Sequence, residues 1–129
     1  MTEADLQKQI ITWCRASLKT EIVYWATSNE RKARPQYMVT LKKMGCLAGV
    51  SDLIFLTING PIFLELKRPT THKIGKSGKR IIAIRGGVQS DAQKEFQTRV
   101  EALGFKYIIL DDFDGFVEFA KINNLTKGN

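Results

Sequence analysis

The sequence predicts an α/β fold in which a mixed central sheet is flanked by helices, with elements in the order α-β-β-β-α-β-α. Three observations lead to this class. Apolar residues recur at helical spacing in three segments, and four other segments are rich in the β-branched and aromatic residues that favour strands. The chain has 129 residues, of which 43% are hydrophobic, so we expect a single domain over residues 1–129 with its own core.

The first helix is predicted over residues 3–18. Thr2 and Asp5 resemble a capping box in which Asp takes the place of Glu or Gln. Apolar residues then recur about once per helical turn, at Leu6, Ile10, Cys14 and Leu18. Residues 22–27 are rich in β-branched and aromatic side chains and predict a strand, and a polar, basic connection follows over residues 31–35.

A β-hairpin forms the centre of the predicted sheet. Residues 53–58 are apolar on both faces, which suits a central strand. Asn59-Gly60 is the strongest short signal for a hairpin turn, and residues 62–67 form the returning strand.

The remaining elements are set by glycine, proline and a second capping box. Residues 68–85 contain Pro, Gly and six Lys or Arg residues and predict an exposed loop, with a short strand as an option near its end at 81–84. Ser90 and Gln93 form a capping box that opens a helix, which ends at Gly104. The chain closes with a strand and a short helix, predicted over residues 105–110 and 114–123.

The positive charge of the chain is concentrated in its middle. The formal net charge is +7, yet residues 31–85 alone carry twelve basic and two acidic residues, a net charge of +10. Those two acids are Asp52 and Glu65. A surface that served only to attract phosphate would gain nothing from acidic side chains, so these two residues need another explanation.

Composition and sequence pattern exclude several classes of protein. The first residues are acidic and then amphipathic, which does not fit a secretory signal, and no apolar run approaches the length of a membrane span. We therefore expect a soluble, cytoplasmic protein with no membrane partner. Cys14, Cys46 and the single histidine, His72, are too few for a Cys/His zinc site, and we expect two buried free thiols.

The predicted hairpin brings acidic and basic side chains to one face of the sheet. Glu65 and Lys67 lie on the same face, with Cα atoms about 6.6 Å apart, because side chains alternate along a strand. A two-residue turn at Asn59-Gly60 sets Asp52 opposite Lys67 and diagonal to Glu65, with Cα atoms about 7–8 Å apart. A four-residue loop keeps Asp52 on this face and a three-residue loop turns it away. Pro61 has no N–H for the first pair, so the longer loop stays an alternative.

Two neighbouring carboxylates and a lysine suggest a metal-assisted hydrolysis. Two carboxylates that face each other repel unless a cation neutralises both. Oxygen ligands favour Mg²⁺ or Mn²⁺ over zinc, and Lys67 would hold the attacking water or stabilise charge on a scissile phosphate. The alternative for Asp52, Glu65 and Lys67 is a structural ion pair on a sheet.

Glu3 and Gln93 are further candidates with simpler alternatives. Glu3 heads the apolar stripe of the first helix and can supply a third carboxylate, whereas its simpler role is a first-turn acid favoured by the helix dipole. Gln93 is fully explained by the capping box.

The basic loop is a candidate DNA-binding surface. Residues 67–85 contain seven basic residues and no acidic one. The basic residues are Lys67, Arg68, Lys73, Lys76, Lys79, Arg80 and Arg85. Such a cluster attracts a phosphate backbone with strong salt dependence and little sequence preference, and its alternative is a solvated, charged face.

Four motifs together resemble the VRR-NUC (virus-type replication-repair nuclease) family of the PD-(D/E)XK nuclease superfamily. They are Gly49-Val50-Ser51-Asp52, Phe63-Leu64-Glu65-Leu66-Lys67-Arg68-Pro69, Gln93 at a helix start and Glu3 in the first helix. The family often has Pro before the Asp, where this chain has Ser51.

The resemblance implies a fold, a metal site and a reaction. It implies a three-layer, restriction-endonuclease-like core with Mg²⁺ or Mn²⁺ held by Asp52 and Glu65, and with Glu3 and the Leu66 carbonyl as additional ligands. Lys67 would activate or orient water, and Gln93 would support it. Free-standing members of the family resemble homodimers that act on branched DNA such as four-way junctions.

Three functions follow as hypotheses. The favoured one is a metal-dependent, structure-selective DNA endonuclease, a Holliday junction resolvase of a virus or prophage that serves recombination and repair. The second is a nuclease that uses the same site on linear or flapped duplex DNA. The third is a non-catalytic DNA-binding module in which the acids are structural.

Overall fold

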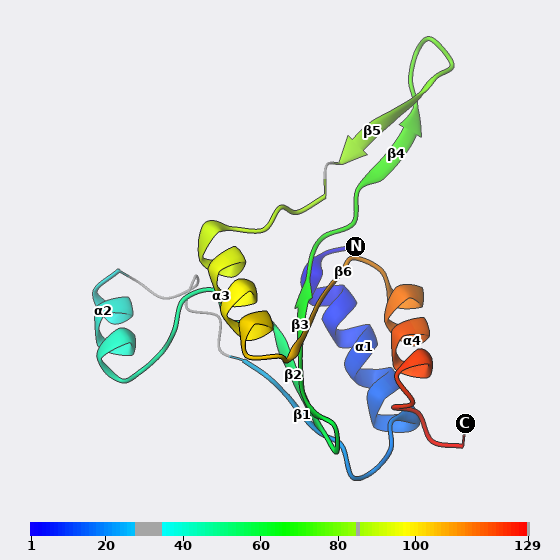
Figure 1. Ribbon diagram of the computed structural model, residues 1–129. Coiled ribbons are helices and arrows are strands. Elements are labelled where there is room, and N and C mark those ends of the chain that lie inside the picture. Colours follow the sequence, from blue (N-terminus) through cyan, green and yellow to red (C-terminus); the bar gives the residue numbers. More distant parts are fainter. Residues whose placement is uncertain (28–34, 85, 129) are drawn as a thin grey trace. The chain divides into compact units, whose positions relative to one another are not determined.

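The computed structural model describes residues 1–27, 35–84 and 86–128 and has a mixed α/β architecture (Figure 1). The mixed α/β class predicted from the sequence is confirmed. The helices of the described residues are α1 (Glu3–Ser17), α2 (Pro35–Lys43), α3 (Asp91–Ala102) and α4 (Phe113–Ile122). The strands in the same residues are β1 (Val23–Ala26), β2 (Leu53–Thr57), β3 (Gly60–Leu66), β4 (Thr71–Ile74), β5 (Arg80–Ile84) and β6 (Lys106–Leu110).

The chain divides into two compact units, each built from segments that are far apart in the sequence. Unit 1 consists of Met1–Thr20, Leu66–Val88 and Ile109–Asn129, and so carries α1, the β4–β5 hairpin and α4. Unit 2 consists of Glu21–Glu65 and Gln89–Ile108, with β1, α2, β2, α3 and most of β3 and β6. The expectation of one domain over residues 1–129 stays a prediction.

In unit 1 the apolar stripe of α1 forms the core together with α4. The Thr2–Asp5 capping box is confirmed, because each residue's side chain accepts a hydrogen bond from the other's backbone N–H. Phe116 of α4 is fully buried, and Trp13 of α1 packs edge-on against it with ring centroids 5.7 Å apart. The predicted stripe is buried throughout, at Leu6, Ile10, Cys14 and Leu18.

In unit 2 the β2–β3 hairpin has a register that differs from the predicted one by two residues. Thr57 pairs with Gly60, so the two-residue turn is Ile58-Asn59 rather than Asn59-Gly60. Thr57 Oγ1 closes this turn, because it accepts from the Asn59 N–H at 3.1 Å and donates to the Gly60 carbonyl at 2.9 Å. The shift is an even number of residues, so every side chain keeps its predicted face.

The described residues form two sheets of different sizes. One has four strands in the order β1-β2-β3-β6, in which β1 and β3 both pair antiparallel with β2. The other is the isolated β4–β5 hairpin, which takes the place of the loop predicted over residues 68–85, and its strand β5 confirms the short strand that was an option at 81–84. The predicted exposure of this segment is confirmed, since all five residues of β5 are exposed.

Two further sequence predictions need correction. Residues 35–43 form α2, where the sequence predicted the end of a polar connection; Pro35 opens this helix, as Pro commonly does at a first helical position. The basic residues predicted in the same connection at 31–34 lie outside the described residues.

Cys14 is buried as predicted, whereas Cys46 is exposed. None of the helices in the described parts of the chain combines the length and apolar character needed to cross a membrane.

Candidate functional site

Glu65 is the most unusual polar residue of unit 2, because its side chain is completely buried. It lies near the end of β3, and two side chains donate hydrogen bonds to its Oε1 atom. The Tyr107 hydroxyl of β6 is one donor, and the Gln89 amide, just before α3, is the other at 3.0 Å. Gln89 also donates to Gln97 at 2.9 Å. A buried carboxylate requires such donors, so this network fixes the position of Glu65.

The surroundings of Tyr107 raise the pKa of its hydroxyl. Burial raises the pKa of the Tyr107 hydroxyl well above its ordinary value. The hydrogen bond to Glu65 and the negative charge of Glu65 raise this pKa further, a hydrogen bond with Gln89 lowers it, and the charge of Asp52 adds a smaller increase. Tyr107 is therefore a protonated donor at neutral pH, and both carboxylates lie within electrostatic reach of the same hydroxyl.

The strand register explains why Asp52 and Glu65 come together. Leu53 pairs with Leu64, so continuing the antiparallel register by one residue sets Asp52 directly opposite Glu65. Residues directly opposite have Cα atoms about 4.5–5.5 Å apart. The Asp52 carbonyl accepts a hydrogen bond from the Thr27 N–H at 3.0 Å, which ties this residue to the end of β1. The predicted diagonal position of Asp52, opposite Lys67, is wrong, but the shared face is correct.

Gly49 of the G-x-x-D motif packs directly against the start of α3. Its φ is +80°, and a Cβ atom there would lie 2.3 Å from the Ala92 carbonyl oxygen and 2.8 Å from the Gln93 backbone nitrogen. Only glycine fits this conformation and this contact without rearrangement. The motif therefore places the segment that leads to Asp52 against the helix that carries Gln93.

Gln93 itself is almost completely buried and forms the predicted capping box. Its Oε1 atom accepts from the Ser90 N–H at 2.9 Å, and its own N–H donates to Ser90 Oγ at 3.2 Å. The structural role of Gln93 is thus confirmed, and its supporting role in catalysis stays a prediction.

Unit 1 brings together Glu3 and Lys67. A Cβ atom on Gly87 would lie 3.3 Å from the Lys67 Cδ atom and 3.7 Å from a carboxylate oxygen of Glu3, so both side chains lie against the same glycine. The Lys67 N–H donates to the Leu110 carbonyl at 2.9 Å, and the Lys67 side chain is largely buried. Leu66, whose carbonyl is a predicted ligand, also has a buried side chain.

The predicted site residues therefore fall into two groups. Asp52, Glu65 and Gln93 belong to unit 2, and Glu3, Leu66 and Lys67 belong to unit 1. Within the described ranges, no three or more His, Cys, Asp or Glu side chains gather into a group that could hold a metal ion. The carboxylates that unit 2 brings together are thus a pair, Asp52 and Glu65.

The predicted DNA-binding residues of the described part of the chain are exposed, apart from Lys67. Arg80 contacts the ring of His72 across the hairpin, with 3.3 Å between the Arg80 Nη2 and His72 Nδ1 atoms. Arg85 lies outside the described residues. The exposed members are Arg68, Lys73, Lys76, Lys79 and Arg80.

The donors that hold Glu65 were not predicted from the sequence. Tyr107 is 42 residues away from Glu65 along the chain and Gln89 is 24 residues away. The one signal for Tyr107 was a hydroxyl-bearing residue in a largely apolar strand, and Gln89 was hidden beside the stronger capping signal of Ser90.

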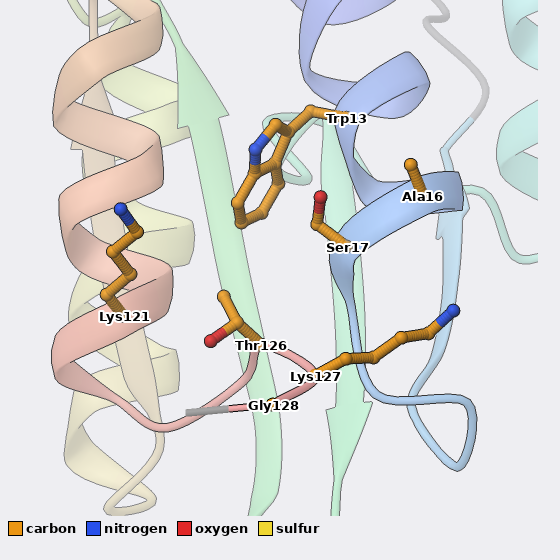
Figure 2. Close-up of a pocket in the computed structure, with 7 residues that line it drawn as sticks. All are labelled: Trp13, Ala16, Ser17, Lys121, Thr126, Lys127 and Gly128. Carbon is orange, nitrogen blue, oxygen red and sulfur yellow. The ribbon is translucent and has the colours of Figure 1, made fainter.

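Unit 1 also contains a pocket of about 340 Å³ near the C-terminal ends of α1 and α4. Figure 2 shows the Trp13 ring along this pocket, with Lys121 and Thr126 nearby. None of the predicted site residues lines it. Its lining residues are Trp13, Ala16, Ser17, Lys121, Thr126, Lys127 and Gly128.

Comparisons with known proteins yield no match, either among family models, among curated proteins or among solved structures.

Proposed function

We propose that this chain is a metal-dependent, structure-selective DNA endonuclease that hydrolyses phosphodiester bonds in four-way junctions. The observation that carries the proposal is the pair of carboxylates at the end of the β2–β3 hairpin. Glu65 is fully buried, Asp52 lies opposite it by strand register, and both stand in the most basic stretch of the sequence. Two acids in that position fit a cation site better than a surface for binding alone.

The chemistry of the donors fits a hard divalent cation. Asp52 and Glu65 offer only oxygen atoms, which suits Mg²⁺ or Mn²⁺, and either ion commonly binds through one or two carboxylates. The Leu66 carbonyl and Glu3 are the additional ligands that the resemblance implies. When bound, such an ion would supply a Lewis acid for the scissile phosphate.

The residues of the chain have distinct proposed roles. Tyr107 and Gln89 are positioning residues, since they donate to Glu65 and hold its side chain in one orientation. Lys67, two residues after Glu65, orients the attacking water, and Gln93 supports this step. The exposed cations of residues 68–80 bind the phosphate backbone.

The proposal extends to the fold and the setting of the activity. We propose a VRR-NUC-like, PD-(D/E)XK core and a homodimer, since two symmetric cuts in a junction require two sites. The proposed setting is the cytoplasm of a bacterial or phage-infected cell, in recombination and repair.

A cleavage assay tests the proposal. Purified protein is incubated with a labelled four-way junction and Mg²⁺, and Glu65→Gln and Asp52→Asn are expected to lower the cleavage rate by at least roughly 100-fold, because each removes an anionic ligand. Lys94→Ala removes an exposed charge from α3 and serves as the matched control. Wild-type cleavage that survives in Glu65→Gln contradicts the assigned role. Linear and flapped duplexes are tested in the same assay. Preferential cutting of either one would show that it, and not the four-way junction, is the substrate.

A second candidate is a non-catalytic DNA-binding module. The hydrogen bonds around Glu65 favour it, because Tyr107 and Gln89 both donate to the Glu65 Oε1 atom and hold this buried carboxylate without a metal. Calorimetric titration with Mn²⁺ separates the two functions. Binding that is lost in Asp52→Asn supports the nuclease, and no binding at millimolar Mn²⁺ supports the module.

A further inference from the structure

The β4–β5 hairpin is a narrow, two-stranded ribbon. Its strands pair antiparallel, from Ile74 with Arg80 to Thr71 with Ile84, and no other strand joins this sheet within the residues described. The turn is closed by the Gly75 N–H, which donates to the Lys79 carbonyl at 2.8 Å. Neighbouring strands lie about 4.8 Å apart, so the backbone of the ribbon is much narrower than a folded domain.

The ribbon exposes apolar side chains on both faces. His72, Ile74 and Arg80 share one face, since Ile74 pairs with Arg80, and Lys73 and Ile81 share the other. Ile74 is 70% exposed, and the exposed large apolar residues of β5 are Ile81, Ile82 and Ile84. An isolated two-stranded hairpin is marginally stable in water, and exposed isoleucines on such a hairpin indicate a surface that becomes buried on binding.

The charge of the ribbon indicates the chemistry of its partner. Residues 71–84 carry four basic side chains and no acidic one: Lys73, Lys76, Lys79 and Arg80. A second copy of the ribbon would bring like charges together, which disfavours pairing between two copies. A polyanion is the complementary partner, and the isoleucines require that it also offer apolar surface.

Duplex DNA meets both requirements in its major groove. The groove is about 12 Å wide and admits a two-stranded β-ribbon, whereas the minor groove is about 6 Å wide. Its walls are phosphates, and its floor exposes base edges and thymine methyl groups. We infer that the β4–β5 hairpin enters the major groove of duplex DNA, with its lysines on the phosphates and its isoleucines against the base edges.

The base of the ribbon connects this inference to the proposed cleavage site. The Gly86 N–H donates to Thr70 Oγ1 at 2.8 Å and the Gly87 N–H donates to the Arg68 carbonyl at 3.0 Å, so the two ends of the hairpin are fastened together. Gly87 is also the residue against which the Lys67 and Glu3 side chains lie. A ribbon in the groove would thus hold duplex DNA near Lys67 and Glu3, two of the residues proposed to act on it, and in this respect the inference rests on the proposed function.

Binding without cleavage tests the ribbon. Fluorescence anisotropy of a labelled 25-base-pair duplex, in EDTA, measures affinity independently of metal. The double variant Lys76→Ala/Lys79→Ala is expected to bind roughly tenfold more weakly and to lower the slope of log affinity against log salt by about 2, one unit for each phosphate contact. Lys8→Ala/Lys94→Ala is the matched control, since it removes two exposed lysines elsewhere. Equal weakening in the two double variants would overturn the inference.

Blocked grooves test where the ribbon lies. A duplex whose cytosines carry glucosylated hydroxymethyl groups in the major groove is expected to bind wild-type protein at least about tenfold more weakly, and netropsin in the minor groove to have little effect. Ile74→Ser/Ile82→Ser should weaken binding severalfold without changing the salt slope. Ile122→Ser, at a position on α4 about as exposed as Ile74, should leave the affinity unchanged. Unchanged affinity for the glucosylated duplex, or competition by netropsin alone, would refute major-groove binding.

The two proposals fail separately. If binding does not depend on the major groove but Glu65-dependent cleavage is intact, the groove-binding role of the ribbon is refuted and the proposed nuclease activity stands. If binding depends on the major groove but the protein cuts no DNA in Mg²⁺ or Mn²⁺, the groove-binding role of the ribbon is supported and the proposed nuclease activity is refuted.

Discussion

The two consecutive β-hairpins of this chain are built alike and placed in opposite surroundings. The β2–β3 hairpin buries alternate residues on one face and the whole Glu65 side chain on the other, whereas every residue of β5 is exposed. The first hairpin holds a charge in place through Tyr107 and Gln89, and the second presents charge to solvent. Burial supplies a fixed position and exposure supplies access, and the proposed nuclease activity would need both.

Core truncation should give the largest difference between the hairpins. Leu64→Ala in β3 is expected to lower the free energy of unfolding by about 2–5 kcal/mol, because Leu64 is fully buried and its removal leaves a cavity. Ile82→Ala in β5 should change it by less than about 0.5 kcal/mol, since the residue is exposed. Urea denaturation measures both values. Similar losses in the two variants would show that β5 is packed in solution.

Two glycines with nearly the same φ provide the next comparison. Gly49 and Gly78 have φ values of +80° and +79°, but a Cβ atom on Gly49 would collide with the Ala92 carbonyl, whereas Gly78 has no neighbour within 4 Å. Gly78→Ala should cost about 1 kcal/mol from strain alone, and Gly49→Ala should cost at least about 1 kcal/mol more. Equal losses in thermal unfolding would contradict the close contact at Gly49.

Removing one donor from Glu65 should have a smaller effect on stability. Tyr107→Phe is expected to cost about 1–3 kcal/mol, because it deletes a hydrogen bond to a buried carboxylate. If Tyr107 positions Glu65 for a cation, the variant should also bind Mn²⁺ roughly tenfold more weakly in calorimetry. Tyr37→Phe, on the exposed surface of α2, is the control. Unchanged Mn²⁺ affinity in Tyr107→Phe would reduce the role of Tyr107 to packing.

The smallest effect at neutral pH concerns the buried cysteine, Cys14. Burial raises the pKa of the Cys14 thiol from 9.0 to about 12, so the folded protein keeps a proton that the unfolded chain loses above pH 9. The contribution of Cys14 to stability is therefore constant below pH 9 and falls as the pH rises from 9 to 12. Urea unfolding at pH 8 and pH 10.5 should show a steeper loss in wild type than in Cys14→Ala. Parallel losses would contradict the burial of this thiol.

Locally encoded elements were predictable from the sequence, and features that depend on distant residues were not. The spacing of Leu6, Ile10 and Cys14 and the two capping boxes predicted α1 and α3 to within one or two residues. The hairpin register was missed by two residues, because Gly60 pairs within the ladder instead of forming the turn.

The candidate site was predictable in its residue types and less so in its arrangement. The alternation along β3 and the even register shift kept Asp52 and Glu65 on one face, as predicted. The hydrogen bonds to Glu65 come from Gln89 and Tyr107, which no local pattern connects to it. Helix α2 was missed because its residues Tyr37, Val39 and Thr40 are exposed and leave no continuous apolar stripe.

The fastened base of the β4–β5 hairpin has a consequence for how such a protein diversifies. Because the Gly87 N–H is bonded to the Arg68 carbonyl, the chain enters and leaves the hairpin at nearly the same point. Segments with adjacent ends can be lengthened, shortened or exchanged without moving the rest of a fold. The length and sequence of the hairpin could then vary without disturbing the rest of the fold, and if the hairpin binds DNA as proposed, a hairpin grafted between residues 70 and 86 would alter that binding.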